Sequence, residues 1–247
     1  MKSPHSFPPQ LRSALRDWWK LESAERGTLS AFCGLIRLLW EFTLDSLPSG
    51  RRRRYGDVDF DWDFRVDTTS ATVGWRDRLL GLFYSPYQAT EPALFHEMLA
   101  SLRIDFGQFT FIDLGSGKGR ALLLAADYPF RRIVGVELLP ALNAVAVENI
   151  RRYKSDSQKC FAIESLCGDA GEFIFPPEPI VLYLFNPLPE AGLRQVIRNL
   201  ENSLQENPRA VYVLYHNPLF EHVVAETPLL KESGGTQQYA IYSSSPG

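Results

Sequence analysis

The stretch FIDLGSGKGRALLLAA, residues 111–126, constrains the fold more than any other part of this sequence. A short apolar run ends at Leu114, glycines occupy positions 115, 117 and 119, and good helix formers follow. The run is typical of a buried strand, and the residues after the glycines are typical of a helix. Glycine lets a ligand approach the backbone closely, and a helix N-terminus offers free N–H groups to polar ligands. The stretch therefore predicts a nucleotide-type cofactor site on an α/β sheet.

The spacing of the glycines argues against two common nucleotide-binding loops. A phosphate-binding GxxxxGK[ST] loop needs glycine at position 112 and Ser or Thr at position 119, where this sequence has Ile112 and Gly119. The dinucleotide fingerprint GxGxxG needs a third glycine at position 120, which is Arg120. This spacing also speaks against a nicotinamide or flavin oxidoreductase.

A second apolar stretch, RRIVGVELLP, predicts the next buried strand, with Glu137 at its end. A carboxylate about 20 residues beyond the glycine loop is where Rossmann-type sheets hold the ribose hydroxyls of a nucleotide. The alternative is that Glu137 only caps the helix expected in PALNAVAVENIRRY.

Strands and helices alternate over the rest of the chain. The pattern predicts strands in CFAIESLCGDA, PIVLYLFNPLP and RAVYVLYHNP, helices in EAGLRQVIRNLENSLQE and near LFEHVVAE, and a hairpin with a Gly-Gly turn in LLKESGGTQQYAIYS. Such alternation is typical of a mostly parallel sheet with helices on both faces. The hairpin adds a C-terminal antiparallel strand.

The pattern D-x-G-x-G-x-G from Asp113 to Gly119, with Glu137 after the next strand, resembles motif I of the class I methyltransferases, which bind S-adenosylmethionine. The stretches DLGSGKGR and GVE are also similar to bacterial methyltransferases and, distantly, to Rossmann-fold lysine methyltransferases. The resemblance covers about residues 85–247 and implies a Rossmann-like seven-stranded sheet. Residues 1–84 are then an N-terminal extension of helices and a strand, which forms a cap or a substrate-recognition region, and residues 85–247 are the S-adenosylmethionine-binding methyltransferase domain.

The resemblance also implies a set of cofactor-binding residues. Asp113 and the glycine loop face the methionine end, Glu137 binds the ribose, and Leu138 packs on the adenine. Asp169 approaches the adenine amino group or, alternatively, caps the turn before EFIF. The FYSPYQATEP stretch corresponds to a loop that closes over the cofactor in similar proteins. The implied set is Tyr87, Thr90, Asp113, Gly115, Ser116, Gly117, Lys118, Gly119, Glu137, Leu138, Asp169, Ala170 and Asn186.

The stretch FNPLP follows the fourth predicted strand, where the family places its reacting centre. It is similar to the N-P-P-Y motif of amine-directed methyltransferases, but Leu188 and Pro189 replace the second proline and the aromatic residue. This departure argues against adenine as the acceptor. The implied catalytic residues are Asn186, Pro187 and Tyr84. His216 is a candidate base, with a purely structural role as the alternative.

Methyl transfer asks the protein for alignment, desolvation and acceptance of a proton, because the methyl group of a sulfonium is attacked in line by the acceptor itself. We expect an amine acceptor such as a protein lysine. The alternatives are a small-molecule or RNA methyltransferase and a catalytically silent cofactor-binding module.

The N-terminal residues show two further patterns. Apolar residues recur at helical spacing in Leu29, Phe32, Cys33, Ile36, Leu39, Trp40, Thr43 and Leu44, which predicts an amphipathic helix that packs on the main domain or in a homodimer, with membrane-surface contact as the alternative. After Arg51–Arg54, the residues Asp57, Asp59, Asp61 and Asp63 alternate with apolar residues. This alternation predicts a strand with one acidic face. Beside the cofactor site, such a face would attract a cationic substrate.

Composition excludes several classes of protein. The net charge of −3 gives no general signal for nucleic-acid binding. The sequence shows no His/Cys metal-site spacing, no secretory signal and no apolar run long enough to span a membrane. The three cysteines form no pairing framework, which favours a reducing, cytoplasmic setting.

Overall fold

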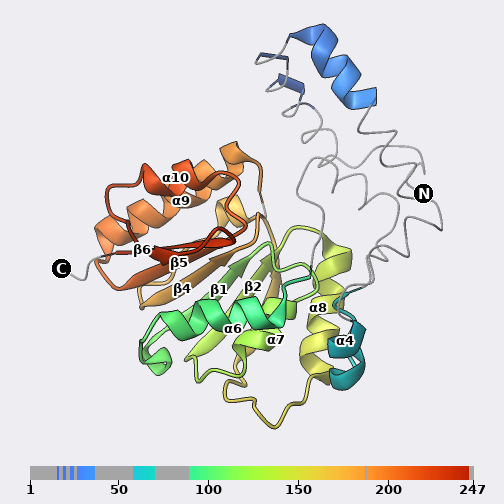
Figure 1. Cartoon of the computed structure of the whole chain (residues 1–247), viewed down its shortest axis with the longest axis vertical. Helices are drawn as coiled ribbons and strands as arrows, with labels where there is room; N and C mark the ends of the chain where they lie inside the picture. Colours follow the sequence, from blue (N-terminus) through green and yellow to red (C-terminus); the bar gives the residue numbers. More distant parts are fainter. Residues whose placement is uncertain are drawn as a thin grey trace, which may run out of the picture. The chain divides into compact units, whose positions relative to one another are not determined.

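A seven-stranded sheet lies at the centre of the fold in the computed structural model (Figure 1). Its strands are β1 (Thr110–Leu114), β2 (Arg132–Glu137), β3 (Ile163–Cys167), β4 (Ile180–Leu184), β5 (Val211–His216), β6 (Lys231–Gly235) and β7 (Tyr239–Ser243). The order is β3-β2-β1-β4-β5-β7-β6, with the first five strands parallel and β7 antiparallel to both of its neighbours. This is the Rossmann-like, mostly parallel seven-stranded sheet with a C-terminal antiparallel hairpin that the sequence predicts.

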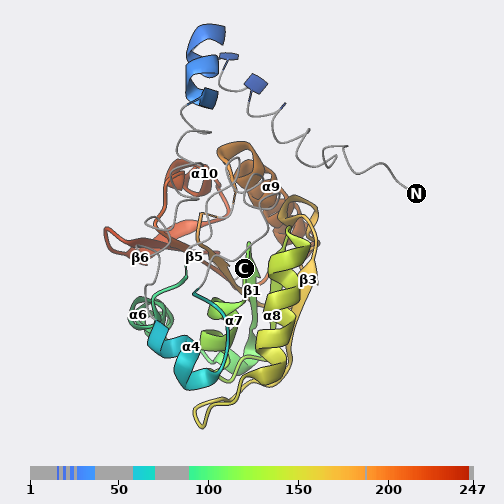
Figure 2. The ribbon, with the colours of Figure 1, turned by 90° about the vertical axis from the view of Figure 1, so that its right-hand side faces the viewer.

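Helices cover both faces of the sheet (Figures 1 and 2). One face packs against α4 (Val58–Phe64), α6 (Pro92–Ser101) and α7 (Arg120–Ala125), through an apolar cluster that includes Phe60, Phe95 and Leu122. The other face packs against α9 (Glu190–Glu206) and α10 (Glu221–Ala225). The remaining elements are α8 (Pro140–Arg152) and the short 3₁₀ helices η1 (Phe106–Gln108) and η2 (Ala170–Glu172).

The burial of the strands follows from these two helical layers. Every residue of β1 and β4 is buried, as expected for parallel strands covered on both faces. In contrast, most of β3 and β6 is exposed or half-buried, because these strands form the two edges of the sheet. The strand order reverses between β1 and β4, and the carboxyl ends of the strands at such a point are the usual ligand site of open α/β sheets.

The acidic strand predicted over residues 57–63 is wrong, because Val58–Phe64 forms helix α4. Phe60 and Phe64 are one helical turn apart, and both rings face the apolar cluster with their centroids 4.8 Å apart. Trp62, which a strand would place on the same face, is 83% exposed. The helix also turns Asp61 toward buried hydrogen-bond donors, a long-range partnership that the local alternation does not contain.

The C-terminal hairpin forms as predicted, but its turn is not the Gly-Gly pair. Gly234 and Gly235 belong to β6, which is irregular between Glu232 and Gly234, and residues 236–238 make the turn. The turn closes with a 2.8 Å hydrogen bond from the Thr236 N–H group to the Tyr239 carbonyl. The glycines therefore serve the irregular end of the strand rather than the turn itself.

The structure describes residues 16, 19–20, 23–24, 27–36, 58–69, 89–186 and 188–244. Residues 28–36 are helical, as their apolar spacing predicts. The predicted continuation to Leu44, the basic run Arg51–Arg54 and the residues Tyr84, Tyr87 and Pro187 lie outside the described residues. Asp57–Thr69 groups with Gln88–Gly247 in one compact unit, and the domain boundary at residue 84 stays a prediction. None of the described helices is long and apolar enough to cross a membrane.

Candidate cofactor site at the carboxyl edge of the sheet

The glycine loop joins β1 to α7 with three residues in the left-handed region. The φ angles are +84° at Gly115, +54° at Gly117 and +82° at Gly119. At Gly119, a Cβ atom would also lie 3.2 Å from the Cβ atom of Ala146 on α8. The conformation and the close approach of α8 both favour glycine here.

The loop folds tightly against β2 and leaves one polar atom without a partner. The N–H groups of Gly115 and Ser116 both donate to the Val136 carbonyl, at 2.8 and 3.0 Å. A Cβ atom on Gly135 would lie 2.7 Å from Ser116 Oγ, so this position on β2 makes room for the loop. Ser116 Oγ is buried and has no hydrogen-bond partner in the described part of the chain. Such an unsatisfied buried group calls for a partner, and a bound ligand is one that can supply it.

Glu137 bridges the glycine loop and the turn that leads into α8. Its Oε2 atom accepts a 2.8 Å hydrogen bond from the Gly117 N–H group, and Oε1 accepts one of 2.8 Å from the Leu139 N–H group. Burial raises the pKa of the Glu137 carboxyl group, against these backbone donors, which lower it. Leu139 is the N-cap of α8, so Glu137 does not cap the first turn of that helix. A carboxylate accepts about four hydrogen bonds in total, so capacity remains for ribose hydroxyls.

Asp113 lies on β1, which pairs with β2 on one side and with β4 on the other. Its register partners are Gly135 on β2 and Tyr183 on β4, and its side chain is buried. Burial, and then the charge of Glu137, raises the pKa of the Asp113 carboxyl group to about 8. A buried carboxyl group in this condition favours a cationic ligand, because a nearby positive charge stabilises its ionised form.

The expected adenine-side residues lie at the ends of β2 and β3. Leu138 is half-buried and follows Glu137 directly, and Ala170 is buried. Asp169 is exposed, and its Oδ1 atom accepts a 2.8 Å hydrogen bond from the Gly171 N–H group at the start of η2. Asp169 therefore does cap the turn, and its second carboxylate oxygen is not used in that bond.

Asn186 ties together the turns that follow β4 and β5. Its Nδ2 group donates to the Asn217 carbonyl, and its Oδ1 atom accepts a 3.4 Å hydrogen bond from the Leu219 N–H group. Asn186 and Asn217 both have positive φ angles, of +43° and +48°. The side-chain amide of Asn186 is thus engaged by the protein at both its nitrogen and its oxygen.

A buried row of polar groups runs beside Asp113. Tyr183 Oη lies 3.2 Å from Thr90 Oγ1 and 2.8 Å from His216 Nδ1. The His216 ring stacks on Phe185, with the ring centroids 3.8 Å apart. Burial lowers the pKa of His216 to about 4, so its imidazole is neutral at pH 7. Thr90 and His216 were singled out from the sequence, whereas Tyr183 was not, because a tyrosine inside an apolar strand looks like an ordinary core residue.

Lys118 lies in the glycine loop, but its side chain leads to another part of the molecule. Its Nζ atom lies 2.8 Å from Asp67 Oδ1, and only 1% of the side chain is exposed. Arg120, one residue beyond the loop, is also buried. Buried cations of this kind need acceptors. Two cations at a predicted buried loop therefore indicate that acidic or hydroxyl partners exist. The sequence does not indicate where in the chain these partners of Lys118 and Arg120 lie.

No family model matches this sequence, and a search of curated proteins also finds no match. Among solved structures, a predicted N6-adenine-specific DNA methylase from Listeria monocytogenes is 16% identical over 64% of this chain, with a TM-score of 0.47. The chain covers 52% of that protein, about half of its length. Precorrin-6y C5,15-methyltransferase from Geobacter metallireducens is 13% identical over 66% of this chain and 93% of its own, with a TM-score of 0.48.

A third solved structure is an RNA methyltransferase from Salinibacter ruber in complex with S-adenosyl-L-homocysteine. It is 18% identical over 64% of this chain and 92% of its own, with a TM-score of 0.40. At these identities the likeness concerns the fold alone. Among the described residues there is no cluster of His, Cys, Asp or Glu that could hold a metal ion.

Proposed function

We propose that this protein is an S-adenosylmethionine-dependent methyltransferase. The observation that carries the proposal is the convergence of Asp113, three positive-φ glycines and Glu137 at the carboxyl ends of β1 and β2. These groups lie on neighbouring parallel strands, beside the point where the strand order reverses. Ligands of open α/β sheets bind at that point.

The residues at this edge fit the parts of the cofactor. Glu137 has acceptor capacity left for the two ribose hydroxyls, and Leu138 offers an apolar side chain for the adenine. Asp113 suits the positively charged methionine end, and the unpartnered Ser116 Oγ atom offers a hydrogen bond near it. When bound, S-adenosylmethionine supplies a methyl group on a sulfonium. The protein then has to align the acceptor, exclude water and take up a proton.

We further propose that the acceptor is an amine, such as a protein lysine. An amine attacks in its neutral form, and the same burial that lowers the pKa of His216 favours the neutral form of an amine bound near it. Pro189 stands where the N-P-P-Y motif has the aromatic residue that would stack on a nucleobase, and the net charge of −3 does not favour a phosphate backbone. The acidic run does not support this choice, because it forms a helix in place of a strand with one acidic face, and Asp61 is paired with Arg120.

The proposal is tested by transfer of radiolabelled methyl groups from S-adenosylmethionine to total protein, total RNA and a small-metabolite extract of the host. We expect label in protein, and less label with Glu137→Ala when S-adenosylmethionine is below saturation. Label only in RNA or only in small metabolites would overturn the amine acceptor while leaving the methyltransferase standing. No transfer to any fraction, together with no binding of S-adenosylhomocysteine, would overturn the methyltransferase itself.

A further inference from the structure

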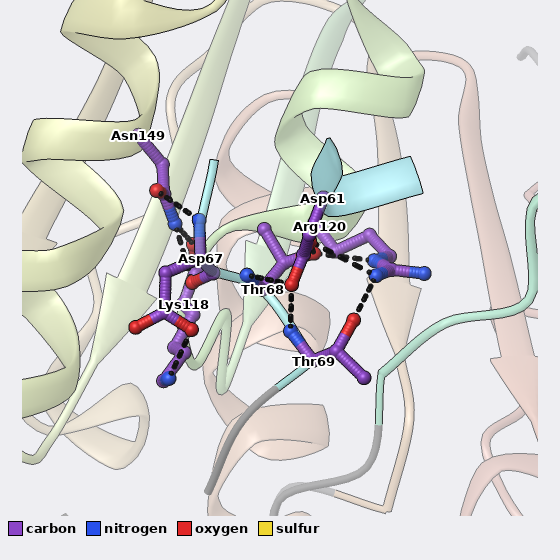
Figure 3. A network of polar contacts seen from close by, with 7 residues as sticks. All are labelled: Asp61, Asp67, Thr68, Thr69, Lys118, Arg120 and Asn149. Atoms are coloured by element: carbon purple, nitrogen blue, oxygen red, sulfur yellow. Dashed lines mark hydrogen bonds and ion pairs between the residues drawn. The ribbon is translucent and has the colours of Figure 1, made fainter. Parts of the chain in front are cut away.

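Seven polar residues form a network beside the glycine loop, and we call this network the clasp (Figure 3). They come from three places in the chain: α4 and the residues after it, the glycine loop with the first residue of α7, and α8. The members are Asp61, Asp67, Thr68, Thr69, Lys118, Arg120 and Asn149. Partners in this network are 7 to 82 residues apart in the sequence.

Arg120 is the centre of one half of the clasp. Its Nε atom donates to Thr68 Oγ1 and its Nη2 atom to Thr69 Oγ1, each at 2.6 Å. Nη2 also lies 3.2 Å from Asp61 Oδ1, and the guanidinium carbon lies 4.5 Å from the centre of the Phe60 ring. The Arg120 and Asp61 side chains are only 2% and 14% exposed. A nearly buried ion pair with this many hydrogen bonds has a well-defined geometry.

Asp61 organises the residues that Arg120 contacts. Its Oδ2 atom accepts hydrogen bonds from the backbone N–H groups of Thr68 and Thr69, at 2.9 and 2.7 Å. Its Oδ1 atom accepts another from the Thr68 hydroxyl group. One carboxylate thus turns both threonine hydroxyls toward the guanidinium of Arg120.

Lys118 and Asn149 form the other half of the clasp. Asn149 Oδ1 accepts a 2.8 Å hydrogen bond from the Asp67 N–H group, and its Nδ2 group donates to the Asp67 carbonyl at 2.9 Å. The same Nδ2 group donates to the Lys118 carbonyl, also at 2.9 Å. The Lys118 ammonium pairs with the Asp67 carboxylate. Asn149 therefore holds the loop backbone and the Asp67 backbone to α8 at once.

The clasp connects the glycine loop with α8, the helix that follows Glu137. Lys118 and Arg120 are the two neighbours of Gly119 in the sequence, so their side chains set the direction of the loop backbone there. Asn149 is on α8, which begins after the Glu137–Leu139 turn. When Lys118, Arg120 and Asn149 are held together, Gly117 and Glu137 are held in the relative position that their 2.8 Å hydrogen bond requires.

We propose that Asp61 and Arg120 are positioning residues of the cofactor site: docking of residues 61–69 on Arg120 sets the conformation of the glycine loop and hence the affinity for S-adenosylmethionine. This inference rests on the proposed function. Neither residue needs to touch the cofactor, because Arg120 acts through the backbone of Gly119 and Asp61 acts through Arg120. The coupling is reciprocal, so a bound cofactor strengthens the docking of residues 61–69 by the same factor.

The test compares three substitutions on one helix. Asp61→Asn removes the charge inside the clasp, whereas Asp59→Asn and Asp63→Asn remove the same charge from exposed positions of α4. The binding of S-adenosylhomocysteine is measured by calorimetry at a temperature where each variant is fully folded by circular dichroism. We expect Asp61→Asn to weaken binding at least tenfold, and both controls to stay within twofold of the wild-type protein.

A second measurement separates positioning from general stability. Hydrogen–deuterium exchange is followed in peptides from the glycine loop, from residues 61–69 and from β5 and β7, with and without S-adenosylhomocysteine. In the ligand-free protein, Asp61→Asn should speed exchange in the loop peptide and leave β5 and β7 unchanged. In the wild-type protein, the ligand should slow exchange at Thr68 and Thr69.

Each outcome decides the inference. Unchanged affinity and unchanged loop exchange in folded Asp61→Asn would overturn it. Equal losses of affinity in all three variants would also overturn it, because they would show that the net charge of α4 lowers the affinity rather than the contact with Arg120. If Asp61→Asn does not fold, Thr68→Val replaces it, because this substitution removes the hydroxyl that links Asp61 to Arg120 at nearly constant shape. If the wild-type protein binds no S-adenosylhomocysteine, the proposed function fails, and the ligand-free exchange experiment still decides the role of the clasp.

Discussion

The glycine loop and residues 58–69 meet in one network, yet they differ in how they encode their structure. In the loop, each determinant is local: an apolar strand, three glycines and a run of helix formers follow one another between residues 109 and 125. In residues 58–69, alternating acidic and apolar residues favour a strand locally, but the segment forms a helix. Its partners, Arg120 and Asn149, lie more than 50 residues away.

This difference shows where a local residue pattern is sufficient to predict the backbone conformation and where it is not. The capacity for a positive φ angle is a property of glycine itself, so the three alternating glycines are visible in the sequence. The burial of Phe60 and the partial burial of Phe64, with Trp62 exposed, are decided by the core and by buried cations that need acceptors. Tertiary contacts therefore override the local period of two.

The substitution with the largest expected effect tests whether residues 58–64 form a helix that buries Phe60 and exposes Trp62. Phe60→Ala should destabilise the protein by about 3 kcal/mol, because it empties a buried site next to the Arg120 guanidinium. Trp62→Ala should change the free energy of unfolding by less than about 0.5 kcal/mol, since the side chain is exposed. Urea unfolding measures both. Similar losses for the two variants would favour the strand, in which both rings share one face.

The next prediction concerns the buried carboxyl group at the end of β1. The pKa of Asp113 is about 8 in the folded state and about 4 in the unfolded chain, so the folded state binds the extra proton between these values. The Asp113 carboxyl group therefore lowers the free energy of unfolding as the pH rises from about 4 to 8. Asp113→Asn removes this penalty, so the variant should gain more stability over the wild-type protein at pH 8 than at pH 5.

Urea unfolding of the Asp113→Asn variant and the wild-type protein at both pH values measures this effect. The same variant should bind S-adenosylhomocysteine more weakly, because it offers no charge to the methionine end. A stability difference that does not change with pH would show that the Asp113 carboxyl group is ionised in the folded protein.

Gly119→Ala tests the local side of the comparison. The left-handed conformation costs a residue with a side chain about 1–2 kcal/mol. The contact of the new methyl group with Ala146 adds to that cost. We expect a loss of about 2 kcal/mol in thermal or urea unfolding. Gly107→Ala, at a glycine without a positive φ angle, is the control. Equal effects at the two sites would show that the loop conformation is not what requires glycine.

Much of the fold, and part of the candidate site, follows from residues that are close in the sequence. The alternation of strands and helices, the hairpin, the glycine loop and the position of Glu137 at a strand end all rest on local patterns and on the general rules for parallel sheets. The helix α4, the turn of the hairpin and the roles of Tyr183 and Arg120 do not. Each depends on which side chains meet across the fold, and a polar residue in an apolar strand looks the same whether or not it has a partner.

Glu137→Ala tests whether the Glu137 carboxylate binds the ribose of the cofactor. It removes an acceptor for ribose hydroxyls and leaves the N–H groups of Gly117 and Leu139 without their partner. We expect S-adenosylhomocysteine to bind about tenfold more weakly, or about 1.4 kcal/mol in binding free energy. Glu172→Ala, at an exposed carboxylate after β3, is the control and should bind as the wild-type protein does. Equal affinity of a folded Glu137→Ala variant would place the ribose elsewhere.

The central claim is that the edge formed by Asp113, the glycine loop and Glu137 is built for S-adenosylmethionine, and calorimetric titration of the wild-type protein tests it most directly. S-adenosylmethionine, S-adenosylhomocysteine and NAD are each titrated at pH 7 in two buffers of different ionisation enthalpy. The account predicts one site for the first two ligands and none for NAD. It also predicts proton release on binding of the first two, because a cation beside Asp113 lowers the pKa of its carboxyl group from about 8. Binding of NAD with no binding of either S-adenosyl compound would contradict it.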